Sequence, residues 1–147
     1  MAAKVISPAS FAKRRFEAFW KKCKEHCKSK KSFFKKFEVD QKHILEAGLL
    51  KNPRRLSLNA NDYAAIIEQG ELIYERCRDS TPIEIAVEGK ILDFEWVDFN
   101  DTSRKKDPFV EVRVVIREAS PKFFIVTVYV LDALIDNGRP EVKKDEW

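Results

Sequence analysis

Hydrophobic and polar positions divide the chain into two parts with different periods. Before Arg78, apolar residues recur at intervals of three and four, which is typical of amphipathic helices. After Thr81, apolar and polar residues alternate, which is typical of half-buried strands. Helices that precede strands in this way indicate an α+β domain. We therefore expect N-terminal helices packed on one face of a four-stranded antiparallel β-meander.

The first part begins with a long predicted helix. Ser7 or Ser10 can cap it, Pro8 suits its first turn, and the period continues through Lys30. Its apolar positions, which make a single stripe, are Phe16, Phe19, Trp20, Cys23 and Cys27. A further helical turn over Lys31–Phe37 is expected to pack on the rest of the domain.

Two more helices are predicted before the strands. A short helix covers Asp40–Leu50, and Arg54–Leu58 is predicted as a short strand or an extended link. A longer helix begins at a cap on Asn59 or Asn61 and ends near Arg78. The apolar stripe of this longer helix holds Tyr63, Ile66, Ile67, Ile73, Tyr74 and Cys77, with Gly70 in the same row.

The second part opens with a predicted hairpin. Ile83–Val87 and Ile91–Val97 flank Glu88-Gly89, a pair typical of a tight turn. This register sets Glu84 opposite Asp93, a like-charge pair that we expect either to face solvent or to be paired with Lys or Arg.

Two further strands complete the predicted sheet. Asn100–Pro108 is a polar loop, Phe109–Glu118 is the third strand and Lys122–Asp132 is the fourth. The residues expected on the apolar faces are Val110, Val112, Val114 and Ile116 in the third strand and Phe124, Val126, Val128 and Val130 in the fourth. The opposite face of the fourth strand is expected to carry Phe123, Ile125, Thr127, Tyr129 and Leu131.

Composition fits one folded domain. The chain has 147 residues, 44% of them apolar and 35% charged, which excludes an intrinsically disordered protein. We expect a basic helical arm over residues 1–37, packed on or extending from the body, a core domain over 38–135 and a polar tail over 136–147. No apolar run reaches membrane-spanning length, no signal-peptide core follows the basic N-terminus, and the three cysteines are an odd number. We therefore expect a cytoplasmic protein with reduced thiols and no transmembrane segment.

Charge is distributed unevenly along the chain. Residues 1–36 contain twelve Lys or Arg and two Glu, whereas the remainder carries 16 basic and 22 acidic residues. A basic arm on a mildly acidic body favours a polyanionic partner such as nucleic acid or anionic lipid, and the candidate contacts include Lys21, Lys22 and Lys28. The alternative interpretation is a solvated helix face whose lysines serve solubility alone.

Cys23, His26 and Cys27 occupy neighbouring positions on the first helix, and Cys77 on another helix is a conceivable fourth zinc ligand. Structural zinc sites more often use Cys-x-x-Cys turns, and buried cysteines commonly act as small hydrophobic residues. We therefore expect no metal, and the four glycines of the chain form no phosphate-cradling or dinucleotide motif. No cofactor is expected.

The polar face of the predicted sheet suggests chemistry on RNA. Arg113, Arg117, Thr127 and Tyr129 would form a cationic surface with hydroxyl groups, and His43 titrates near neutral pH. Cleavage of RNA through its 2′-hydroxyl needs a base, an acid and donors that hold the charge on the phosphorus oxygens. Ordinary strand residues and a surface histidine are the structural alternative.

Two short motifs resemble the barnase–EndoU–colicin–RelE nuclease superfamily, in particular its phage and polymorphic-toxin branches. They are Lys42-His43-Ile44 near the front and Ile125-Val126-Thr127-Val128-Tyr129 in the last strand, within Val39–Leu131. The resemblance implies helices before a four-stranded sheet and a metal-independent ribonuclease toxin acting on RNA such as tRNA. A cognate inhibitor or another protein is a further candidate partner.

On this resemblance the catalytic residues would be His43, Thr127 and Tyr129, with Arg113 as a phosphate contact by position. Lys42 and Arg117 would bind the nucleic acid. Two other hypotheses remain open. One is a non-catalytic module whose Lys-rich arm binds nucleic acid and whose sheet edge or face engages a protein partner. The other is a membrane-peripheral or host-interaction protein. Its Phe16/Phe19/Trp20 stripe would dock into anionic lipid or into a groove of a partner.

Overall fold

The computed structural model describes residues 8–39, 60–78, 81–98, 103–131 and 138–140. The helices are α1 (Pro8–Glu25), α2 (Lys30–Lys36) and α4 (Ala60–Gln69). The strands are β1 (Phe37–Val39), β2 (Glu71–Arg78), β3 (Glu84–Asp98), β4 (Arg104–Ala119), β5 (Lys122–Val130) and β6 (Gly138–Pro140). These elements confirm the α+β class.

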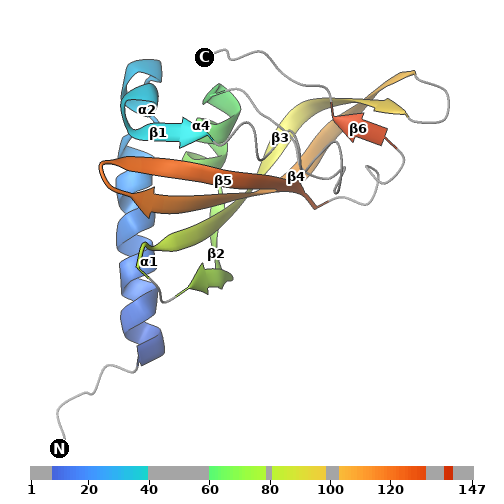
Figure 1. The fold of residues 1–147 in the computed structure, drawn as a ribbon. Helices are drawn as coiled ribbons and strands as arrows, with labels where there is room; N and C mark the ends of the chain where they lie inside the picture. The colour runs from blue at the N-terminus through green and yellow to red at the C-terminus, as the bar shows by residue number, and fades with distance from the viewer. Residues whose placement is uncertain (1–7, 40–59, 79–80, 99–102, 132–137, 141–147) are drawn as a thin grey trace, which may run out of the picture.

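The sheet is more complex than the predicted four-stranded antiparallel meander. Its strand order is β1-β5-β4-β3-β2, with β6 paired to β3, and β1 runs parallel to β5. Figure 1 shows α1, α2 and α4 lying together on one side of this twisted sheet, while the β3–β4 ribbon extends beyond them. The hydrophobic core fills the space between these helices and the apolar sheet face.

The apolar stripe of α1 packs into this core, as the spacing predicts. Phe16, Phe19, Cys23 and Cys27 are buried, and the indole Nε1 of Trp20 donates to the carbonyl of Ile67 at 2.9 Å. A basic helix thus lies on the body with its lysines outward.

Helix α1 ends at Glu25, before the predicted end at Lys30. Ser29 has an extended backbone, and its side chain accepts a hydrogen bond from the Ser32 amide at 3.1 Å, so it caps α2. The predicted helical turn that follows is confirmed as α2, with Phe33 in the core.

The predicted long helix before Arg78 is wrong in its second half. Helix α4 ends at Gln69, and β2 begins two residues later at Glu71. At Gly70 the chain passes so close to other backbone that an added Cβ would lie 2.3 Å from the Ile66 carbonyl oxygen and 2.4 Å from that of Glu88. Glycine therefore permits the tight junction of helix and strand.

The predicted hairpin at Glu88-Gly89 is also wrong, because β3 continues through both residues. Gly89 pairs with Val112, and a Cβ there would lie 3.1 Å from Cγ2 of Ile66 on α4. Gly89 therefore allows α4 to pack closely on the sheet, and it does not form a turn. The predicted helix over residues 40–50 and the strand or link over 54–58 lie outside the described residues.

The third predicted strand is confirmed and longer than expected. It begins at Arg104, so it includes part of the predicted Asn100–Pro108 loop. Its predicted apolar residues Val110, Val112, Val114 and Ile116 are all fully buried in the core.

The fourth predicted strand, β5, reverses its faces at a bulge. Val115 pairs with Thr127 and Ile116 pairs with Ile125, which leaves Val126 as an extra residue. As a result Phe123 and Ile125 enter the core beside Val128, whereas Phe124 and Val126 are only half-buried. The predicted face assignment holds at Thr127 and Val128 and is wrong from Phe123 to Val126.

Candidate functional site

Two of the predicted site residues lie outside the described part of the chain. Lys42 and His43 belong to the range 40–59 that the structure does not describe. Tyr129 is described only as a strand residue whose backbone pairs with Arg113. Convergence of His43 with the sheet therefore stays a prediction.

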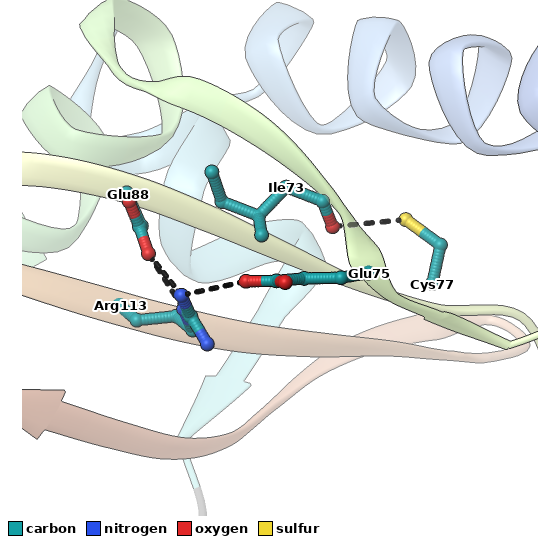
Figure 2. Close-up of polar contacts among 5 residues, drawn as sticks. All are labelled: Ile73, Glu75, Cys77, Glu88 and Arg113. Carbon is teal, nitrogen blue, oxygen red and sulfur yellow. Dashed lines mark hydrogen bonds and ion pairs between the residues drawn. The ribbon is translucent and has the colours of Figure 1, made fainter.

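Arg113 lies on the sheet face away from the helices and is held by two carboxylates. Its Nε donates to Glu88 Oε1 at 2.8 Å, and its Nη2 contacts the same oxygen and lies 3.3 Å from Glu75 Oε1. Figure 2 shows both carboxylates pointing at the guanidinium, one from β3 and one from β2. With its side chain 14% exposed, Arg113 has its positive charge offset within the protein. A phosphate would have to displace a carboxylate to reach it.

A second ion-pair cluster lies four residues further along β4. Arg117 donates from Nη2 and Nε to Glu84 Oε2, at 2.9 and 3.2 Å, and Arg78 Nε lies 3.9 Å from Glu84 Oε1. Glu84 thus pairs with two cations, and the expected like-charge pairing of Glu84 with Asp93 is wrong. Two guanidinium groups share one carboxylate here, so the cluster retains positive charge.

A hollow of about 270 Å³ opens beside this second cluster, and we call it the β-face hollow. Its lining residues are Glu75, Arg76, Arg78, Glu84, Val115, Arg117, Val126 and Thr127. Thr127 is 4% exposed, and within the described part of the chain its Oγ1 has no hydrogen-bond partner. The structure therefore brings predicted residues Arg117 and Thr127 to one site, while it gives Arg113 carboxylate partners.

The predicted lysine contacts are exposed on α1 and on the turn that follows it. Lys21, Lys22 and Lys28 are exposed, as are Lys30 and Lys31 at the start of α2. Among the residues described, none of these five forms an ion pair. We call these five residues the lysine surface.

The cysteines do not gather around a metal position. Cys27 Sγ donates to the Cys23 carbonyl at 3.2 Å, His26 Nδ1 lies 3.1 Å from Ser32 Oγ, and Cys77 is on a strand. No group of three potential ligands converges anywhere in the described ranges. Figure 2 shows the Cys77 thiol directed at the carbonyl of Ile73, 3.4 Å away.

Burial controls the thiol chemistry. Burial raises the pKa of Cys23 well above its usual value. Burial is also the main reason that the pKa of Cys27 is raised to about 12. Burial also raises the pKa of Cys77. All three thiols are therefore protonated at neutral pH and act as packing groups.

The sequence interpretation missed the acidic partners and the arginines of β2. The predicted helix ends near Arg78 and therefore places Arg76 and Arg78 outside the sheet. A signal for the ion pairs exists, since Glu84 and Glu88 have the same spacing as Arg113 and Arg117. Antiparallel pairing of two such strands sets each Glu opposite an Arg.

Comparisons of this chain with protein-family models, with curated protein sequences and with solved structures found no match. The resemblance to the barnase–EndoU–colicin–RelE superfamily therefore stays a prediction. Within the described ranges, none of the helices has both the length and the apolar character needed to cross a bilayer.

Proposed function

We propose that this chain binds nucleic acid through the lysine surface of α1, α2 and the turn between them. The observation that carries the proposal is the burial of the apolar stripe of α1, with Phe16 only 5% and Phe19 only 2% exposed. This burial fixes the helix on the body and turns its lysines to solvent, without ion pairs among the described residues. A fixed array of unneutralised cations attracts the phosphate backbone by releasing condensed counterions.

The same observation disfavours docking into lipid or a partner groove. The stripe that would insert is part of the core, with Phe16, Phe19 and Cys23 all buried against the sheet and α4. Exposing these side chains would cost the hydrophobic free energy that holds α1 in place.

The expected result is salt-sensitive binding that depends on the lysine surface. Reversing charge with Lys30→Glu and Lys31→Glu should weaken binding of a single-stranded RNA at least about tenfold near 0.1 M salt and reduce the salt slope by about 1.4. Acidic residues in the first turn favour a helix, so this variant retains α2. Fluorescence anisotropy over a salt series measures both quantities.

A matched control carries the same change in net charge on the β3–β4 ribbon. Lys90 and Lys106 are exposed there, and Lys90→Glu with Lys106→Glu should leave most of the affinity and the slope intact. Equal losses in the two variants would mean that net charge alone drives binding and that the lysine surface has no special part.

Cleavage of the bound RNA is a second candidate function, favoured by the meeting of Arg117 and Thr127 at the β-face hollow. In this candidate His43 would exchange the protons and the arginine would hold the phosphate. The expected result is degradation of total RNA in EDTA by the wild type and loss of degradation in His43→Ala and Thr127→Ala. RNA that stays intact at high protein concentration would remove cleavage and leave binding untouched.

A further inference from the structure

The β-face hollow has the size and charge of a site for one small anion. Its volume of about 270 Å³ lies just below the range of roughly 300–1,000 Å³ typical of sites for drug-sized ligands. Three of its lining residues are arginines and two are glutamates, of which Glu75 already faces Arg113. Beside the Glu75–Arg113 pair, Arg78 and Arg117 set two positive charges against the one carboxylate of Glu84.

Donors remain available on two arginines of the hollow, Arg117 and Arg78. A guanidinium carries five N–H groups, and Arg117 directs only Nε and Nη2 at Glu84. The Arg117 side chain is 47% exposed and that of Arg78 is 72% exposed. Both side chains can therefore turn N–H groups toward an anion while Glu84 keeps them near the hollow.

Thr127 supplies the observation that points to a ligand. A buried hydroxyl without a hydrogen-bond partner is unfavourable, and native proteins rarely retain one. Thr127 lines the hollow at the bulge of β5, and the structure gives its Oγ1 no partner among the described residues. An anion oxygen would accept the hydroxyl hydrogen.

We propose that the β-face hollow binds a single phosphate group, held by Thr127 Oγ1–H and by the guanidinium groups of Arg117 and Arg78. The choice of phosphate among anions rests on the proposed nucleic-acid function. Planar guanidinium groups match the oxygens of phosphate, as they do those of a carboxylate, in pairs. Because Thr127 Oγ1 is buried, the lining of the hollow must rearrange in the complex for phosphate to reach it. The site is separate from the lysine surface, which lies on α1, α2 and the turn between them.

The test is a titration with inorganic phosphate at constant ionic strength, followed by backbone amide shifts in NMR. We expect saturable shifts at residues 115–117 and 126–127. Thr127→Val should lower the affinity for phosphate at least about tenfold. The substitution removes a hydrogen bond to a charged group and keeps the shape of the side chain. Arg117→Lys should also weaken it, because the paired donors are lost.

Three further arms decide the interpretation. Lys30→Glu with Lys31→Glu should leave the affinity of the β-face hollow for phosphate unchanged. Loss of nucleic-acid binding at the lysine surface can therefore be distinguished from loss of phosphate binding at the hollow. A short oligonucleotide that shifts the same amides would identify a backbone phosphate, whereas shifts by inorganic phosphate alone would identify a free phosphate or phosphate ester. Acetate should cause no saturable shift.

The proposal is overturned by any of three results: no saturable shift with phosphate, equal affinity in wild type and Thr127→Val, or equal shifts with acetate. The thermal unfolding midpoint is measured for each variant. The Thr127→Val protein should melt no lower than the wild type, so a lost phosphate response reports the site and not the fold.

Discussion

Replacing Phe123 by alanine should lower the free energy of unfolding by about 4 kcal/mol, a large part of the stability of a domain of this size. Phe123 is 4% exposed, and its ring centroid lies 5.0 Å from that of Phe19 and 5.5 Å from that of Phe37. The side chain therefore joins β5 to α1 and β1. Urea unfolding followed by circular dichroism measures the change.

The neighbouring residue is the control. Phe124 is half-buried and pairs with Arg117 on the other face, so Phe124→Ala should cost only about 1 kcal/mol. If the side chains of β5 alternated without a bulge, Phe124 would lie in the core and Phe124→Ala would cost more stability than Phe123→Ala. A larger loss for Phe124 than for Phe123 would show that β5 has no bulge at Val126.

Gly70→Ala should destabilise the protein by about 3 kcal/mol or more. The new methyl would lie 2.3 and 2.4 Å from two backbone carbonyl oxygens and 2.9 Å from Cγ1 of Val87. Backbone at a packed junction cannot move away as a flexible side chain can, so the overlap must be relieved by separating α4 from β2 and β3. The unfolding midpoint in urea should fall with an unchanged m-value.

Gly89→Ala is the matched comparison for this junction. Its methyl would meet Ile66 at 3.1–3.3 Å, contacts that need shifts of a few tenths of an ångström. Alanine also suits a strand interior better than glycine, which offsets part of the cost. We expect a loss of about 1 kcal/mol or less, and equal losses at both glycines would contradict the close approach at Gly70.

Local periodicity predicts the elements whose burial depends on one face. The stripe of α1 and the valines of β4 follow their expected periods of 3.6 and 2, so both were found from the sequence. The β2 segment was misassigned because Ile73, Tyr74 and Cys77 continue the helical spacing of α4. Only Gly70 interrupts that spacing, and its packing role depends on the distant residue Glu88.

The bulge in β5 and the continuity of β3 depend on how these strands pair with β4. Val126 becomes an extra residue only when β5 is matched to β4, and nothing within the strand marks it. At the candidate site, the arginine-bearing face was predicted from alternation in β4. The predicted hairpin places Glu88 in a turn, so it does not pair Glu84 and Glu88 with the arginines of β4. In the structure one long strand, β3, sets both glutamates opposite those arginines.

The capped break at Ser29 fixes the backbone that carries three residues of the lysine surface. Lys28, Lys30 and Lys31 surround a cap whose side chain is hydrogen-bonded to Ser32. A preorganised surface loses little conformational entropy on association, in contrast to a basic tail that must fold on its target. Long-range attraction, and not coupled folding, would then set how fast such a partner is captured.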